Sequence, residues 1–162
     1  MGAQVFPGRY TADTDEDFVV FIIGMRINNY RAVRKWFPVF TAMPAMIKEL
    51  SMNKELGCLS IENFFGLRTT IMIQYWRSEQ QLLAYAKGSK HLPAWRNFNK
   101  KVGNNDAVGI YHETYLIRAD GFETIYGNMP KFGLAKAIGS TEITAANNSA
   151  HKRIKKNYVL QK

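Results

Sequence analysis

The sequence predicts an α+β domain with the ferredoxin-like, split βαβ arrangement. Three observations support this fold class. The segments alternate in the order strand, helix, strand, strand, helix, strand, and 162 residues are enough for one domain. The first three strands are apolar on both faces, so both faces of an antiparallel sheet must be covered. We expect helices on one face and a second copy of the chain on the other, giving a homodimeric α+β barrel.

Four segments have the composition of strands, since they are rich in β-branched and aromatic residues and are bounded by turn residues. Gly24 lies inside the first of them and indicates a bulge or a close approach by another group. Gly66-Leu67-Arg68 is a short hairpin connection between the second and the third. The predicted strands are Phe18–Ile27, Cys58–Phe65, Thr69–Trp76 and Ile110–Ile117.

The first helical segment follows Asn28-Asn29, which are favourable N-cap residues, and Gly57 is expected to end it. Pro38 and Pro44 lie within it, so the segment forms either two short helices or one kinked helix. Its apolar residues recur at helical spacing. The expected buried stripe consists of Met43, Met46, Ile47 and Leu50.

The second helical region is divided at Gly88-Ser89. Ser78 is the expected N-cap of a helix over Glu79–Lys87, and Pro93 suits the first turn of another over Pro93–Lys101. After the fourth strand we predict a short fifth strand in residues 123–128 and a loop rich in Pro and Gly in residues 128–142. The predicted organisation is an extended arm (1–17), the main domain (18–137) and a basic tail (138–162).

Charge and cysteine content exclude several classes of function. The net charge is +9, but residues 149–162 carry five cationic and no acidic side chains, while the rest has 17 basic and 13 acidic residues. A solvated basic tail is therefore favoured over nucleic-acid binding, for which no motif is present. The single Cys58 excludes an internal disulfide and a cysteine metal cluster. Residues 1–17 do not resemble a signal peptide and no apolar run is long enough to span a bilayer, so we expect a cytoplasmic protein.

Four sequence blocks resemble a known family: YWRSEQQLLAYA, HLPAWRNFNKKVG, VGIYHETY and IYGNMPKFGLAKA. The Trp-x-Ser-x-x-x-Leu pattern resembles the antibiotic-biosynthesis monooxygenase superfamily of dimeric α+β barrels. The blocks together resemble more closely a small uncharacterised family that is grouped with a monooxygenase of fungal fumagillin biosynthesis. The resemblance covers about residues 17–137.

This resemblance implies a pocket between the sheet and its helices. Some superfamily members oxygenate polycyclic phenols or quinols without a metal or organic cofactor, and others bind haem through a histidine on the second helix. The corresponding position here carries Trp95, and His91 lies four residues earlier. We therefore expect either no cofactor or haem, with His91 as the candidate iron ligand.

Three residues are candidates for catalysis. His91 precedes a helix start, where the helix dipole favours a neutral imidazole that would act as a general base or ligate iron. His112 and Glu113 are adjacent on a strand, so they point to opposite faces of the sheet. A capping or buried structural role is the alternative for each.

Aromatic, basic and amide side chains are candidates for substrate binding. Aromatic rings would form the walls of an apolar site, and arginines would hold an anionic group or oxygen intermediate. An asparagine that opens a loop would donate to an oxyanion or cover the pocket as a lid. A core, surface or turn role is the alternative. The candidates are Trp76, Trp95, Tyr75, Tyr126, Arg96, Arg26 and Asn128.

Other catalytic templates are absent from the sequence. It has no Gly-rich phosphate loop, no HExxH motif and no nucleophile elbow around Ser60 or Cys58. No protein-built metal site is expected. We predict a small monooxygenase-like enzyme that acts on an aromatic, polyketide or terpenoid substrate. The alternative is a non-catalytic protein that binds haem or another hydrophobic ligand.

Overall fold

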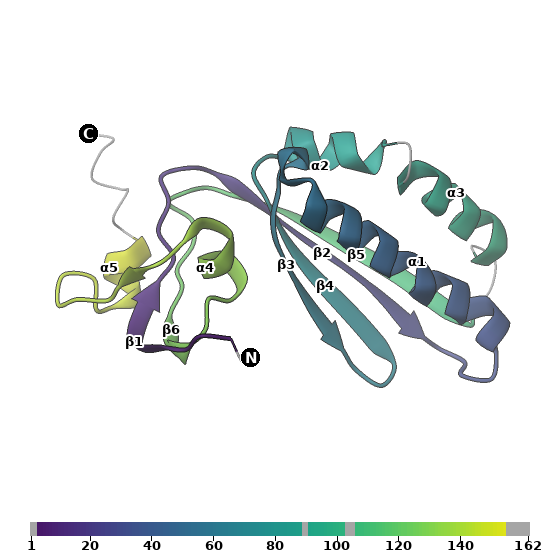
Figure 1. Cartoon of the computed structure of the whole chain (residues 1–162), viewed down its shortest axis with the longest axis horizontal. Coiled ribbons are helices and arrows are strands. Elements are labelled where there is room, and N and C mark those ends of the chain that lie inside the picture. The colour runs from purple at the N-terminus through teal and green to yellow at the C-terminus, as the bar shows by residue number, and fades with distance from the viewer. Residues whose placement is uncertain (1–2, 89–90, 103–105, 155–162) are drawn as a thin grey trace.

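The protein consists of a large four-stranded sheet with helices on one face and a smaller three-stranded sheet beside it (Figure 1). The computed structural model describes residues 3–88, 91–102 and 106–154, without the side chains of residues 91, 94, 97, 101 and 102. Within this described part, none of the helices is long and apolar enough to cross a membrane.

The large sheet has the strand order β3-β4-β2-β5 and is antiparallel throughout. It is formed by β2 (Phe18–Ile27), β3 (Cys58–Phe65), β4 (Thr69–Trp76) and β5 (Val108–Ile117). This is the order of the split βαβ arrangement, so the α+β, ferredoxin-like fold class is confirmed. The first three strands coincide with the predicted segments, and the fourth begins two residues earlier.

Three helices cover one face of this sheet: α1 (Val33–Met52), α2 (Glu79–Ala86) and α3 (His91–Val102). The α1 helix is continuous through Pro38 and Pro44, so this segment forms one helix and not two short ones. It begins at Val33, later than predicted, because Asn29 forms a local turn in which its Oδ1 accepts a hydrogen bond from Arg31 N. A short 3₁₀ turn, Lys54–Leu56, follows and ends at Gly57, which is left-handed with φ 95° as a C-terminal glycine should be.

The small sheet has the order β6-β1-β7 and joins the two ends of the chain. Its strands are β1 (Phe6–Thr11), β6 (Tyr126–Met129) and β7 (Thr141–Glu142), with α4 (Gly133–Ile138) and α5 (Ala150–Ile154) beside them. The prediction of an uninterrupted loop over residues 128–142 was wrong, since this segment contains a helix.

Contacts distant in sequence hold α4 against the uncovered face of the large sheet. Glu62 Oε1 accepts hydrogen bonds from Gly133 N and Lys136 Nζ, both at 3.1 Å, and Ser60 Oγ donates to Gly133 O at 3.4 Å. Tyr126 OH accepts from Ala135 N at 3.2 Å. These partners lie outside the helix, so the local sequence does not reveal it.

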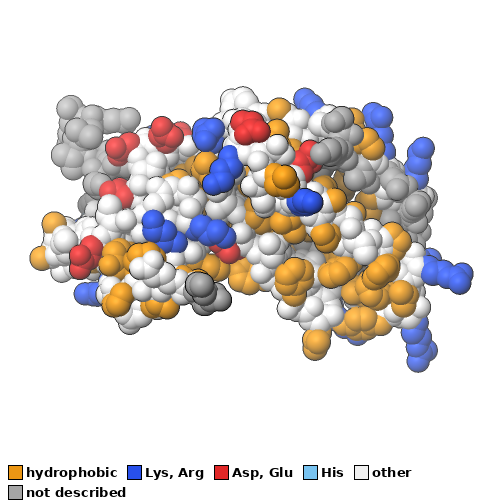
Figure 2. Space-filling view, in the orientation of Figure 1, with side chains coloured by type: hydrophobic (Ala, Val, Ile, Leu, Met, Phe, Trp, Pro, Cys, Tyr) orange, Lys and Arg blue, Asp and Glu red, His pale blue; other side chains and the backbone are white. Residues whose placement is uncertain are grey.

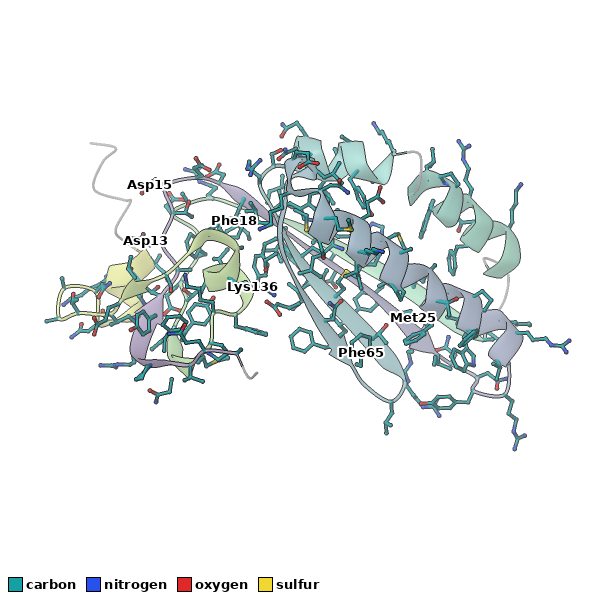
Figure 3. All side chains as sticks on the ribbon, in the orientation of Figure 1. Asp13, Asp15, Phe18, Met25, Phe65 and Lys136 are labelled. Atoms are coloured by element: carbon teal, nitrogen blue, oxygen red, sulfur yellow. The ribbon has the colours of Figure 1, made fainter. Side chains whose placement is uncertain are left out.

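Trp76 is fully buried at the centre of the main hydrophobic cluster, between the sheet and the helices. A second cluster joins β2 to the small sheet through Phe18 and Leu134, and a third lies around Met25 under α1 and α3. Figure 3 shows these regions, with Phe18 between the two sheets and Met25 beneath α1.

Gly24 is required by a close approach, which was one of the two predicted alternatives. The register of β2 with β4 and β5 has no bulge at this point. A Cβ atom on Gly24 would lie 2.6 Å from the Tyr111 ring and 2.7 Å from Thr70 O. The glycine therefore makes room for Tyr111 to lie across the face of the sheet that lacks helices.

We predict that Gly24→Ala lowers the free energy of unfolding by about 1–3 kcal/mol, because the backbone oxygen of Thr70 cannot move aside as a side chain would. Urea denaturation followed by circular dichroism measures the change. Gly127→Ala is the matched control, since a Cβ there would meet nothing within 4 Å. Equal stability of the Gly24→Ala variant and the wild type would contradict this account of the close approach.

Candidate active site

A pocket of about 330 Å³ lies between the helix-covered face of the large sheet and helices α1, α2 and α3. Its lining is mostly apolar and includes three methionine side chains. The sheet contributes Phe21, Ile23, Met72, Gln74, His112 and Thr114, and the helices contribute Met43, Met46, Leu50, Leu82, Leu83, Tyr85, Ala86 and Trp95. A few polar groups in an apolar cavity are typical of a small-molecule site.

The strand β5 places His112 and Thr114 on the pocket wall, because alternate residues of a strand share a face. The His112 ring lies 5.7 Å from the Phe21 ring, measured between centroids, and the residue remains accessible to solvent. An accessible imidazole at the edge of an apolar pocket can accept a proton from a bound ligand.

Gln74 is a buried polar residue in the pocket wall, 6% exposed. Its Oε1 accepts a hydrogen bond from Trp76 Nε1 at 2.8 Å, and its Nε2 donates to Met72 Sδ at 2.9 Å. Trp76 thus lies beneath the pocket and fixes the orientation of the Gln74 amide. The amide presents a polar group within an otherwise apolar wall.

Tyr85 brings a phenol to the pocket from α2. Burial, with smaller contributions from the nearby Glu49 and Cys58, raises the pKa of Tyr85 to about 12. The phenol therefore stays protonated at neutral pH and keeps its ability to donate a hydrogen bond. Ser78 orients the helix that carries it, because its Oγ accepts from Gln81 N at the N-cap.

Trp95 lies on the pocket wall from α3, is 39% exposed, and stacks on Phe98 with 5.6 Å between ring centroids. The helix begins at His91, so Pro93 falls in its first turn as predicted. The His91 side chain lies outside the described residues, and its role as base or ligand remains a prediction. Arg96 is exposed next to Trp95 and is not part of the described pocket lining.

The other predicted site residues lie away from this pocket. Glu113 is on the opposite face of the sheet, where its Oε2 accepts a hydrogen bond from Tyr115 OH at 2.8 Å. Arg26 is exposed at the end of β2, with Nη1 3.4 Å from Thr69 Oγ1. Asn128 has φ 51°, and its Oδ1 accepts from Gly8 N at 3.0 Å within the small sheet.

Tyr75 and Tyr126 lie together at the junction of the two sheets, next to Gly133 of α4. A Cβ on Gly133 would be 3.2 Å from Tyr75 OH, and Gly133 has a positive φ of 56°. Burial raises the pKa of Tyr75, and Tyr126 and Glu62 add to the shift. This arrangement fastens α4 to the sheet and stands apart from the pocket.

Cys58 is not a nucleophile in this fold. It is 5% exposed, and burial raises the pKa of its thiol to about 12, so it stays protonated at neutral pH. The described residues also include no group of three His, Cys, Asp or Glu side chains that could hold a metal ion.

The polar pocket residues that the sequence analysis missed are Gln74 and Thr114. It also missed the role of Tyr85 as a protonated hydrogen-bond donor. A signal for Gln74 was present: it has the same strand parity as Met72 and Trp76, so a polar side chain stands at a core position. Thr114 shares the parity of His112 in the same way.

The described lining does not fit haem. A porphyrin carries two carboxylates, and no Lys or Arg is among the described lining residues to pair with them. A volume of about 330 Å³ also lies near the lower end of small-molecule pockets. His112 is the one described imidazole in the lining, and no step proposed below passes through haem.

Comparison with known proteins identifies related sequences. The profile of the family described as Monooxygenase af470-like matches residues 18–134. The chain is also 28% identical over 120 residues to Monooxygenase af470 from Aspergillus fumigatus (strain ATCC MYA-4609 / CBS 101355 / FGSC A1100 / Af293). The match covers 68% of this chain and 42% of that protein, so the chain spans less than half of the curated relative.

Among solved structures, an aldoxime dehydratase superposes with a TM-score of 0.68 at 18% identity, over 90% of this chain and 46% of that one. The aldoxime dehydratase OxdRE in complex with butyraldoxime gives a TM-score of 0.64 at 16% identity, over 86% of this chain and 41% of that one. At these identities the likeness shows the fold alone. The 90% coverage reaches beyond the 18–134 segment of the family match.

Proposed function

This chain belongs to the Monooxygenase af470-like family, and we propose that it is a monooxygenase-like enzyme for a hydrophobic substrate. The match covers 42% of the curated relative. We therefore base the proposed activity on the residues of this chain as well as on the family. The observation that carries the proposal is the pocket, in which an accessible imidazole and two neutral hydrogen-bonding groups stand among apolar walls.

The pocket favours a flat, apolar substrate with one acidic hydroxyl group, such as a hydroxyarene. Three methionines supply adaptable, polarisable walls, and Trp95 offers an aromatic face at the side. Charged groups are absent from the described lining, so a permanently charged substrate would lose its hydration without compensation. His112, Gln74 and Tyr85 then orient the hydroxyl group.

In the proposed reaction, the imidazole of His112 takes the hydroxyl proton of the substrate and leaves an electron-rich aryloxide. A ring carbon of the aryloxide bonds to dioxygen, and the protonated imidazole returns the proton to give a hydroperoxide. Loss of the ring hydrogen then cleaves the O–O bond and releases water. The balance is hydroxyarene plus O₂ giving quinone plus water, and the substrate supplies all four electrons that reduce dioxygen.

The protonated phenol of Tyr85 and the amide of Gln74 have a positioning role in this proposal. The phenol donates a hydrogen bond to the developing aryloxide or peroxide oxygen, which is favourable in a pocket that excludes water. The contacts of the Gln74 amide with Met72 and Trp76 keep it from rotating freely. His91 and Arg96, both on α3, are proposed to act at the pocket mouth.

We also propose that the protein is a homodimer that pairs through the face of the large sheet opposite the helices. This face carries Ile22, Ile73 and the partly exposed rings of Tyr111 and Tyr115. The α4 helix covers only the part near Ser60 and Tyr75. The face also carries Glu113, hydrogen-bonded to Tyr115, and its exposed apolar and aromatic side chains support pairing with a second copy.

We predict that the purified protein accelerates oxygen uptake with 9-anthrone, which enolises to a tricyclic hydroxyarene, and forms anthraquinone and water. His112→Ala should lower kcat/KM about 100-fold or more, the usual contribution of a general base. An oxygen electrode and the absorbance of the quinone measure the reaction against the rate without protein.

His151→Ala is the control, since His151 lies in α5 away from the pocket. Ala86→Trp, which fills the pocket, should abolish both binding and turnover. Saturable binding of anthrone without faster oxygen uptake would contradict the enzyme proposal and favour a ligand-binding protein. Equal activity of His112→Ala and wild type would contradict the role of this histidine.

For the dimer, sedimentation equilibrium should give twice the 18.5 kDa mass of the chain. Ile73→Lys should shift the mass to that of a monomer, because it places a charge in the middle of the paired face. Ile125→Lys, at a residue that is 53% exposed outside the large sheet, is the control. A monomeric wild type at micromolar concentration would contradict the proposal.

A further inference from the structure

A second apolar surface lies at the end of the large sheet where β3 turns into β4. Leu67 is 94% exposed and Phe65 is 72% exposed, although both are large hydrophobic residues. Figure 2 shows hydrophobic side chains gathered over the β3–β4 hairpin and α1, and Figure 3 places Phe65 on this hairpin. We refer to this surface as the apolar tip, formed by Tyr30, Val33, Phe37, Phe40, Phe65 and Leu67.

The α1 helix contributes a continuous stripe to the apolar tip. Val33, Phe37 and Phe40 are spaced i, i+4, i+7 and so lie on one face of the helix. This stripe is distinct from the inward one that includes Met43 and Leu50, which lines the main pocket. The helix is therefore apolar on two faces, and among the described residues the second face remains largely exposed.

Cations surround the apolar tip. The segments 26–37 and 63–70 contain five cationic and no acidic residues. Among the described residues, Asp106, which lies two residues before β5, is an acidic residue near this end of the sheet. Figure 2 shows blue side chains along the same edge. The cations are Arg26, Arg31, Arg34, Lys35 and Arg68, and all are exposed.

The protruding hairpin is held in a fixed position. Tyr30 OH donates a hydrogen bond to Leu67 O at 2.5 Å, and Arg68 Nη1 donates to Asn28 O at 3.3 Å. The Arg68 guanidinium lies 4.8 Å from the centre of the Tyr30 ring, a cation–π contact. Leu67 is thus held projecting into solvent, 94% exposed.

We propose that the apolar tip docks on an anionic membrane surface. Large apolar and aromatic side chains that project from a rim of cations are the pattern of a protein that inserts shallowly between lipid headgroups. Protein interfaces are also rich in aromatic residues and Arg, but the five cations and no acidic residue of segments 26–37 and 63–70 favour an anionic surface. The charge of the tip is complementary to phosphatidylserine and similar headgroups.

The apolar tip is also connected to the main pocket. Phe40 and Phe65 line a small apolar cavity together with Met43 and Met72, and both methionines line the main pocket as well. A hydrophobic molecule leaving the bilayer at the tip would therefore meet apolar side chains along its path. This route rests on the proposed function, whereas docking itself does not depend on it.

The test is co-sedimentation of the full chain with vesicles of phosphatidylcholine, with and without phosphatidylserine as the anionic lipid. We expect binding to the anionic vesicles that weakens as salt rises. Leu67→Ser with Phe65→Ser, and separately Arg26→Gln, Arg31→Gln and Arg34→Gln together, should each weaken binding about tenfold or more. These side chains are exposed, so the variants should fold, which circular dichroism verifies.

Two controls separate this surface from general hydrophobicity and charge. Leu116→Ser removes a 60% exposed leucine at the other end of β5, and Lys48→Gln, Lys54→Gln and Lys87→Gln together remove three cations elsewhere. Both should bind as the wild type does.

Absence of vesicle binding would overturn the proposal. So would equal loss in the control variants, or self-association that disappears in the tip variants, which would indicate a second copy as the partner. If the wild-type protein binds the vesicles but does not accelerate oxygen uptake, only the proposed reaction is overturned.

Discussion

The need to cover an apolar sheet on both faces is the constraint on which this structure depends. Strands β2 and β4 carry large apolar residues in alternate directions, so both faces of the sheet present apolar surface. Trp76 anchors the helix-covered face, where helices leave a pocket rather than a solid core. On the other face, α4 covers one end through Glu62 and Ser60, and the remaining part is the surface that we propose pairs with a second copy. The pocket and the proposed dimer thus have the same origin.

The chemistry of the pocket follows from the absence of Lys, Arg, Asp and Glu from its described lining. The Tyr85 phenol is protonated at neutral pH, as tyrosine ordinarily is, and burial raises its pKa further from neutrality. The Gln74 amide is fixed by Trp76 and Met72, so both act as neutral groups. His112 stands at the accessible edge of the pocket, where it can exchange protons with water. A site of this kind suits a substrate that supplies its own electrons and forms its charge only after binding. Membership of the Monooxygenase af470-like family supports the same proposed class of reaction.

The sequence predicts the large sheet well, because its strands are rich in β-branched and aromatic residues, and three of them coincide with the structure. It does not predict the small sheet, since β1 pairs with strands more than one hundred residues away. Helix α4 escapes prediction for the same reason: Glu62 and Tyr126 stabilise it from outside. In the site, strand parity places His112 and Glu113 on opposite faces. Only the packing of the helices decides that His112 is the one in the pocket.

The most direct test of the central claim is the NMR spectrum of protein labelled with ¹³C at the methionine methyl groups, titrated with 2-naphthol. Met43, Met46 and Met72 line the pocket, while Met52 and Met129 are exposed elsewhere. The account predicts that the three pocket methyl signals shift together and saturate with one dissociation constant, and that the two exposed signals do not move. Saturating shifts at Met52 or Met129, with the pocket methyl signals unchanged, would contradict it.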